Sequence, residues 1–245
     1  MRIRVVLLGD VGSTMDEARR LGAVEEGTVV VARSQSAGLG RMGRKWYSPV
    51  GGLWFTLVLY PRTSVQLSPL LTLMSTVAVS RGIASVSGLH PTIRWPNDVY
   101  LNGRKVAGIL TEVHAIGDTA ERALVGVGVN ANFGLEQLPP DVRDNATTLL
   151  HETGSEVNID HLLNSILSEL GRLYQLFKTG RMVEIVREAR TEADLFGKHV
   201  RVTLLNGSML TGVFEELDDS GNAVLKTGHD KVRITPERVW RVEVL

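Results

Sequence analysis

The chain has 245 residues, 27 basic and 27 acidic side chains, and no cysteine. This composition predicts a soluble globular protein of one or two domains, and it excludes disulfides, thiolate metal sites and cysteine nucleophiles. The zero formal net charge argues against nucleic-acid binding, and no apolar run is long enough for a membrane span or a signal peptide. We therefore expect a cytoplasmic protein with no nucleic-acid or membrane partner.

Three elements are predicted before the first long loop: a strand, a helix and a second strand, over residues 2–8, 13–21 and 28–32. Thr14 and Glu17 have the spacing of a capping box at the start of that helix. Capping is therefore the structural explanation for at least one of the adjacent hydroxyls of Ser13 and Thr14.

The loop over residues 35–52 contains five glycines and three cationic side chains. They are concentrated at Gly38, Gly40, Arg41, Gly43, Arg44 and Lys45. A glycine backbone can curl closely around a ligand, and free N–H groups beside guanidinium groups suit an anion, above all a phosphate. The loop joins two strands, which argues against a Walker P-loop and a dinucleotide fingerprint, because both of those open a helix. A solvated basic loop is the alternative that this stretch leaves open.

A mixed, largely antiparallel sheet is predicted from the elements that follow. A strand over 53–60 and a helix over 68–86 precede four more strands, over 92–95, 99–101, 105–114 and 124–130. Asn102-Gly103 is a strong hairpin signal, and consecutive hairpins argue against a βαβ winding. The stretch 133–156 lacks periodicity, and we expect it to be irregular, as in a lid over a site.

The last part of the chain has a different pattern. Helices are predicted over 160–179 and 182–193. Five short alternating strands follow, over 199–204, 208–215, 223–226, 231–234 and 239–244, as is typical of a small barrel. We therefore expect two domains, residues 1–193 and 194–245.

Three polar residues in the middle of the chain could carry chemistry. Asn97 and Asp98 follow Pro96 at a strand end, where a carboxylate could hold Mg²⁺ or accept from a ribose or an adenine. A turn in which both side chains bond their own backbone is the alternative. Lys105 begins an apolar strand and is either an edge residue or a placed cation. No Ser-His-Asp set and no histidine pair with metal-ligand spacing is evident, so no metal-binding residue is assigned.

Four motifs become specific in combination. They are G-x-G-R-x-G-R-x-W-x-S-P-x-G-G-L, W-P-N-D, K-x-x-G-I-L-x-E and G-x-G-x-N, in this order. With the early S-T pair and the small C-terminal barrel, they closely resemble the biotin–protein ligases, over nearly the whole chain. The resemblance implies a mixed-sheet α/β catalytic domain related to class II synthetases, followed by an SH3-like β-barrel. We expect the form of the family without an N-terminal helix-turn-helix repressor domain.

The resemblance also implies an activity. Members activate biotin with ATP, as biotinyl-5′-AMP, and transfer biotin to one lysine of a biotin carboxyl carrier protein. ATP with Mg²⁺ is the implied cosubstrate, and a homodimer formed by edge-to-edge sheet pairing is a further implied partner. The residues agree with this chemistry, because a carboxylate that attacks a phosphate needs positive charge nearby.

Site residues follow from the same resemblance. Lys105 and Arg41 are implied as catalytic cations. The implied biotin-binding residues are Ser13, Thr14, Met15, Gln35, Gly38, Leu39, Gly40, Arg41, Lys105 and Gly108. The implied ATP- and adenylate-binding residues are Arg41, Arg44, Trp46, Asn97, Asp98, Lys105 and Asn130.

This sequence departs from the family pattern at Leu39 and Met42, where basic residues are frequent, and at Arg94, where lysine precedes W-P-N-D. The first two changes remove charge from the loop. Two other functions stay open, a lipoate or octanoyl ligase on the related fold and a non-catalytic adenylate-binding regulator. The W-P-N-D stretch and the SH3-like tail favour biotin, and the presence of both Arg41 and Lys105 favours catalysis.

Overall fold

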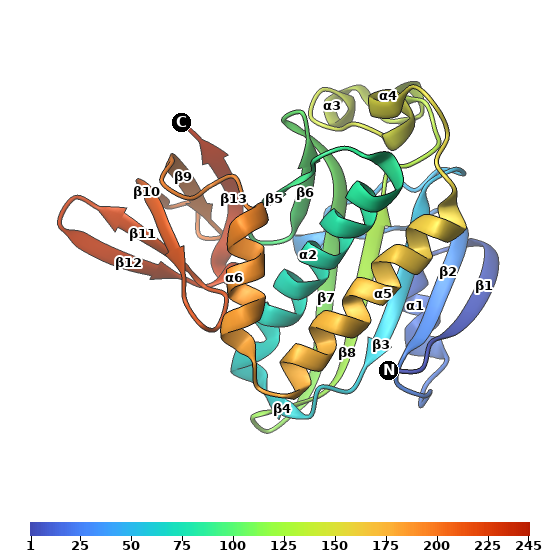
Figure 1. Cartoon of the computed structure of the whole chain (residues 1–245), viewed down its shortest axis with the longest axis horizontal. Coiled ribbons are helices and arrows are strands. Elements are labelled where there is room, and N and C mark those ends of the chain that lie inside the picture. Colours follow the sequence, from blue (N-terminus) through green and yellow to red (C-terminus); the bar gives the residue numbers. More distant parts are fainter.

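A computed structural model describes all residues, 1–245, and contains two β-sheets (Figure 1). The main sheet has eight strands: β1 (Arg4–Val11), β2 (Thr28–Gln35), β3 (Leu53–Leu59), β4 (Thr63–Ser64), β5 (Thr92–Arg94), β6 (Asp98–Leu101), β7 (Arg104–Ile116) and β8 (Thr119–Val129). Their order is β1-β2-β3-β8-β7-β6-β5, with β4 paired to β8. Only β1 and β2 are parallel, so the mixed, largely antiparallel α/β fold is confirmed.

The two faces of the main sheet pack against different helices, because strand side chains point alternately to either side. On one face, Val29, Leu57 and Val125 belong to the large core under α2 (Ser68–Ser87) and α5 (Ile159–Lys178), with α6 (Met182–Glu192) beside α2 (Figure 1). On the other face, Val30, Val58 and Leu124 pack against α1 (Thr14–Arg20). Since α1 has only seven residues, it covers only part of that second face.

The helical segment Val65–Ser87 is long and apolar enough to cross a membrane by length and composition. In the structure, 67% of its apolar window is buried inside the protein, where α2 packs between the main sheet and α5. Its apolar character is explained by burial on more than one side.

Two local predictions are corrected by the structure. The N-cap of α1 is Ser13, whose Oγ accepts from the backbone N–H of Met15 at 3.2 Å, so the capping box of Thr14 and Glu17 is wrong. The stretch 133–156 is not irregular throughout, since it contains a 3₁₀ turn at Leu135–Gln137 and two short helices, α3 (Pro140–Arg143) and α4 (Leu149–Thr153). Helices of four and five residues are too short to show the periodicity on which sequence prediction depends.

The second sheet contains the five C-terminal strands, all antiparallel: β9 (His199–Leu204), β10 (Met209–Leu217), β11 (Ala223–Thr227), β12 (Asp230–Ile234) and β13 (Val239–Val244). Their order is β12-β11-β10-β9-β13, so the sheet is open between β12 and β13. This antiparallel sheet is consistent with the predicted SH3-like barrel. Trp95 joins this sheet to the main one, with its ring 6.0 Å from that of Phe214 and its Nε1 3.0 Å from the carbonyl of Gly221. The domain boundary near Asp194 stays a prediction.

Candidate active site

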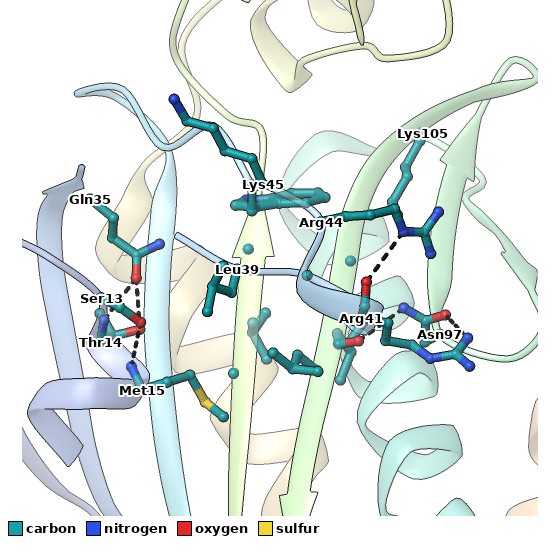
Figure 2. Close-up of a pocket in the computed structure, with 18 of the residues that line it drawn as sticks. Ser13, Thr14, Met15, Gln35, Leu39, Arg41, Arg44, Lys45, Asn97 and Lys105 are labelled. Carbon is teal, nitrogen blue, oxygen red and sulfur yellow. Dashed lines mark hydrogen bonds between the residues drawn. The ribbon is translucent and has the colours of Figure 1, made fainter. Parts of the chain in front are cut away.

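A cavity of about 250 Å³ lies on the face of the main sheet that α1 only partly covers (Figure 2). Twelve of the fifteen predicted site residues line it: Ser13, Thr14, Met15, Gln35, Leu39, Gly40, Arg41, Arg44, Trp46, Asn97, Lys105 and Gly108. Figure 2 shows Ser13, Thr14 and Gln35 at one end and Arg41 with Asn97 at the other, with Leu39 between them. Residues 90 positions apart in the sequence therefore converge on one cavity.

One end of the cavity contains a chain of hydrogen bonds whose direction is fixed. The backbone N–H of Thr14 donates to Gln35 Oε1 at 2.8 Å, which identifies Oε1 as the carbonyl oxygen of that amide. Thr14 Oγ1 lies 3.1 Å from the same oxygen, so its one proton is donated there. The Thr56 hydroxyl donates in turn to Thr14 Oγ1 at 2.9 Å. The Thr14 hydroxyl can therefore only accept from a ligand.

The Ser13 hydroxyl, in contrast to that of Thr14, can donate a hydrogen bond to a ligand. Its Oγ accepts from the backbone N–H of Met15, so its own proton is not used in that bond. Ser13 and Thr14 are both buried, and they present one donor and one acceptor side by side. This pair is complementary to a ligand edge in which a carbonyl oxygen lies next to an N–H group.

The other end of the cavity carries positive charge. Lys105 Nζ lies 2.6 Å from Asp98 Oδ1 and 5.2 Å from the centre of the Trp46 ring, and its side chain is 26% exposed. Lys105 is therefore a held cation and not a free edge residue. Asp98 does not line this cavity, and its contact with Lys105 shows that it holds the lysine in place.

Arg41 is bound from three sides. Its Nη1 donates to Asn97 Oδ1 at 3.0 Å, and its Nη2 donates to the carbonyls of Val239 at 3.1 Å and Pro236 at 2.5 Å. Burial lowers the pKa of the Arg41 guanidinium, and the nearby Asp98 charge opposes that effect, so the group stays cationic. Asn97 Nδ2 also donates to the carbonyl of Ile109, which fixes the orientation of the amide.

Glycines on two neighbouring strands make room for the walls of the cavity. A Cβ at Gly128 would lie 2.4 Å from Trp46 Nε1, and one at Gly108 would lie 3.0 Å from the Trp46 ring. A Cβ at Gly126 would lie 2.9 Å from Met15 Sδ. The cavity residues that we did not predict are Lys45, Ile109, Leu110, Gly126, Val127, Gly128 and Val142. The two-residue spacing of glycines in the G-x-G-x-N motif is the signal that could have identified Gly126 and Gly128.

Two further predicted residues lie outside the cavity. Gly38 is a buried residue of the loop 35–52. A Cβ at this position would lie 2.6 Å from the carbonyl oxygen of Trp46 and 3.0 Å from Ser48 Oγ. Asn130 borders a neighbouring cavity of about 150 Å³ that shares Trp46 and Lys105 with the first. Its Nδ2 donates to the carbonyl of Thr147 at 3.1 Å. Gly38 and Asn130 therefore support the walls of the site in the unliganded protein.

The comparisons with known proteins agree with this arrangement. Residues 9–130 match the model of the biotin/lipoate A/B protein ligase family, and residues 195–235 match the biotin protein ligase C-terminal domain. The bifunctional ligase/repressor BirA of Bacillus spizizenii is 36% identical over 220 residues, which cover 89% of this chain and 67% of that protein. The biotin–[acetyl-CoA-carboxylase] ligase of Paracoccus denitrificans is 32% identical over 229 residues, which cover 90% of this chain and 93% of that protein.

A solved structure shows the same fold over almost the whole chain. The biotin protein ligase from Aquifex aeolicus in complex with biotin and ATP superimposes with a TM-score of 0.86 at 28% identity, covering 98% of this chain and 99% of that one. One family model includes lipoate ligases, but the C-terminal model and these three relatives are named for biotin or for a ligase/repressor. The chain therefore belongs to the biotin protein ligase family.

Proposed function

We propose that this enzyme joins biotin to ATP in the cavity of about 250 Å³ and then transfers the biotinyl group to a lysine of a carrier protein. The observation that carries the proposal is that the cavity has hydrogen-bonding groups at one end and cations at the other. The Ser13 donor and the Thr14 acceptor at one end match the carbonyl and N–H of a cyclic urea, and Lys105 and Arg41 at the other end match a carboxylate and a phosphate.

The first step needs little beyond positioning and positive charge. A carboxylate oxygen of biotin attacks the α-phosphorus of ATP, the bond to the bridging oxygen breaks, and pyrophosphate leaves. Lys105 and Arg41 reduce the repulsion between the two anions and stabilise the charge that develops on the phosphate. Arg41 keeps N–H groups on Nε and Nη1 for this task, because the observed bonds use one proton of Nη1 and those of Nη2.

The second step releases AMP. The amine of the carrier lysine attacks the acyl carbon of biotinyl-5′-AMP, the acyl–phosphate bond breaks with AMP as the leaving group, and the amine gives up a proton to solvent water. The three loop cations would keep the intermediate in the cavity until the carrier arrives. Mg²⁺ is expected as part of the Mg–ATP substrate, where it binds the polyphosphate oxygens.

Incubation of the purified chain with ATP, labelled biotin and a biotin carboxyl carrier domain tests the proposal. Label on the carrier lysine is expected with biotin and not with lipoate or octanoate. Label transfer from lipoate would make the chain a lipoate-type ligase, and adenylate binding without transfer would make it a regulator.

The same proposal includes a cytoplasmic location and a homodimer. The homodimer would form through the edges of the main sheet, of which β1 and β5 are the outer strands.

Gly128→Ala is expected to weaken the binding of biotin and ATP together by about tenfold or more. The new Cβ would collide with the Trp46 indole, and overpacking of this kind costs about 1–3 kcal/mol. Gly171→Ala is the matched control, because nothing lies within 4 Å of its added Cβ. Calorimetric titration measures both variants, and equal affinities would show that the position of Trp46 does not shape the site.

Tryptic cleavage of the loop at Arg41, Arg44 and Lys45 is expected to slow sharply when biotin and ATP are both present. Met42 adopts a left-handed conformation with φ of 59°, and Leu39 is 49% exposed, so the unliganded loop has strained and uncovered residues. An anion would hold its like charges together. Cleavage at other sites is the internal control, and an unchanged loop cleavage rate would contradict this prediction.

A further inference from the structure

The backbone of Lys105 lies at a weak point of the main sheet. The β6–β7 hairpin turns at Asn102-Gly103, so Lys105 is only the second residue of β7. On its other side β8 ends at Val129, which is paired with Ala107, two residues short of Lys105. Without another partner, the N–H and C=O of Lys105 on that side would have no hydrogen bond, and the strand end would be free to move.

The segment Asn145–Thr147 takes the place of the missing strand. The N–H of Lys105 donates to the carbonyl of Asn145 at 2.9 Å, and the N–H of Thr147 donates to the carbonyl of Lys105 at 2.9 Å. Lys105 and Ala146 thereby form an isolated parallel bridge. The position of the lysine backbone therefore depends on a segment 40 to 42 residues away in the sequence.

Glu152, on α4, fixes this segment to the hairpin. Its carboxylate accepts from Thr147 Oγ1, from Arg104 Nη2 at 2.8 Å and from Asn102 Nδ2 at 2.6 Å. The side chain of Glu152 is only 5% exposed, so these three bonds replace its contact with water. Burial acts to raise the pKa of Glu152, but the bonds from Thr147, Asn102 and Arg104 outweigh it and leave the pKa below its ordinary value.

We propose that Glu152 is a positioning residue for adenylate formation, because it joins both ends of the clamp that holds the backbone of Lys105. The inference rests on the proposed function. Arg104 and Asn102 precede Lys105 on the hairpin, and Thr147 is one of the two residues that bond to the Lys105 backbone. Glu152 itself lines none of the cavities that contain Lys105, so it acts on the reaction only through the lysine and the wall formed by Asn145 and Ala146.

Glu152→Gln is expected to lower the single-turnover rate of biotinyl-AMP formation by about 10- to 100-fold, the scale of a small misplacement far from the chemistry. The biotin dissociation constant should stay within about twofold, because Ser13, Thr14 and Gln35 lie at the other end of the cavity. Amide hydrogen exchange at Lys105 and Thr147 should become faster. Thr147→Val, which replaces only the hydroxyl by a methyl group, should show a smaller loss of the adenylation rate. It is measured in place of Glu152→Gln if that variant does not fold.

Glu192→Gln is the matched control. Glu192 is also a partly buried carboxylate held by an arginine, with its Oε1 2.6 Å from Arg81 Nε, but it lies on α6 at the helical face of the protein. Its replacement should lower thermal stability without changing the adenylation rate. The proposal is overturned if Glu152→Gln and Glu192→Gln form biotinyl-AMP at equal rates. It is also overturned if the adenylation rate and the biotin affinity of Glu152→Gln fall in the same proportion. If the unmodified chain forms no adenylate, the proposed function fails, while hydrogen exchange at Lys105 still tests the clamp.

Discussion

Lys105→Ala is expected to lower the rate of biotinyl-AMP formation by about 100- to 1,000-fold, the scale for loss of one preorganised group that stabilises developing charge. The Lys105 ammonium is held between Asp98 and the Trp46 ring, so it needs no reorganisation when the carboxylate meets the phosphate. Its contribution should be larger in the transition state than in the ground state, and biotin affinity should therefore fall much less than the rate. Lys105→Arg should not restore the rate fully, because the planar guanidinium of arginine does not have the geometry of the compact lysine ammonium.

Rapid-quench measurement of adenylate, with biotin affinity measured separately, tests this prediction. Lys178→Ala is the control, because Lys178 donates to the carbonyl of Tyr60, lies over the Tyr174 ring and does not line the cavity. An adenylation rate for Lys105→Ala close to that of the unmodified enzyme would mean that the lysine is a structural edge residue and that its role in catalysis is wrong.

Arg41→Met is expected to release biotinyl-AMP before the carrier arrives. A hydrogen bond to a charged group contributes about 1.5–3 kcal/mol, which corresponds to an intermediate bound roughly 10- to 150-fold more weakly. The change also removes the bonds to Asn97, Pro236 and Val239, so the loop loses these hydrogen bonds to the C-terminal part of the chain and keeps the contact of Arg44 with the Trp240 ring. Free adenylate should then accumulate in solution and label lysines on bystander proteins.

Arg33→Met is the control for Arg41→Met. Arg33 forms its ion pair with Asp10 on the strands β1 and β2 and does not line the cavity. Mass spectrometry of a bystander protein mixed with the carrier gives the ratio of stray to specific labelling. A ratio for Arg41→Met equal to that of Arg33→Met would show that Arg41 does not retain the intermediate.

Much of the fold could be predicted because its signals are local. The hairpin at Asn102-Gly103 requires positive φ at both positions, and the structure has 48° and 78° there. Burial alternates along β9, and the predicted bounds of all five C-terminal strands differ from the observed ones by at most two residues. The capping box failed because Ser13 and Thr14 are both able to cap, and the pairing of Thr14 with Gln35, 21 residues away, decides between them.

The candidate site was predicted less completely than the fold. Motif resemblance identified twelve of the nineteen residues that line the cavity, but it gave no way to separate them from residues that hold them in place. Asp98, Asn130 and Gly38 contact Lys105, Thr147 and Trp46 from outside the cavity. Glu152 had no sequence signal, because its importance arises only when α4 folds back onto the β6–β7 hairpin.

Formation of biotinyl-5′-AMP by the purified chain is the most direct test of the central claim, that one cavity binds biotin at its Ser13 end and activates it at its Lys105 end. The chain is incubated with biotin and α-³²P-labelled ATP, and the nucleotides are separated by chromatography. We expect labelled biotinyl-5′-AMP, and one pyrophosphate for each adenylate formed, only when biotin is present. ATP that stays intact with biotin at saturating concentration, or an adenylate that forms with lipoate and not with biotin, would contradict the central claim.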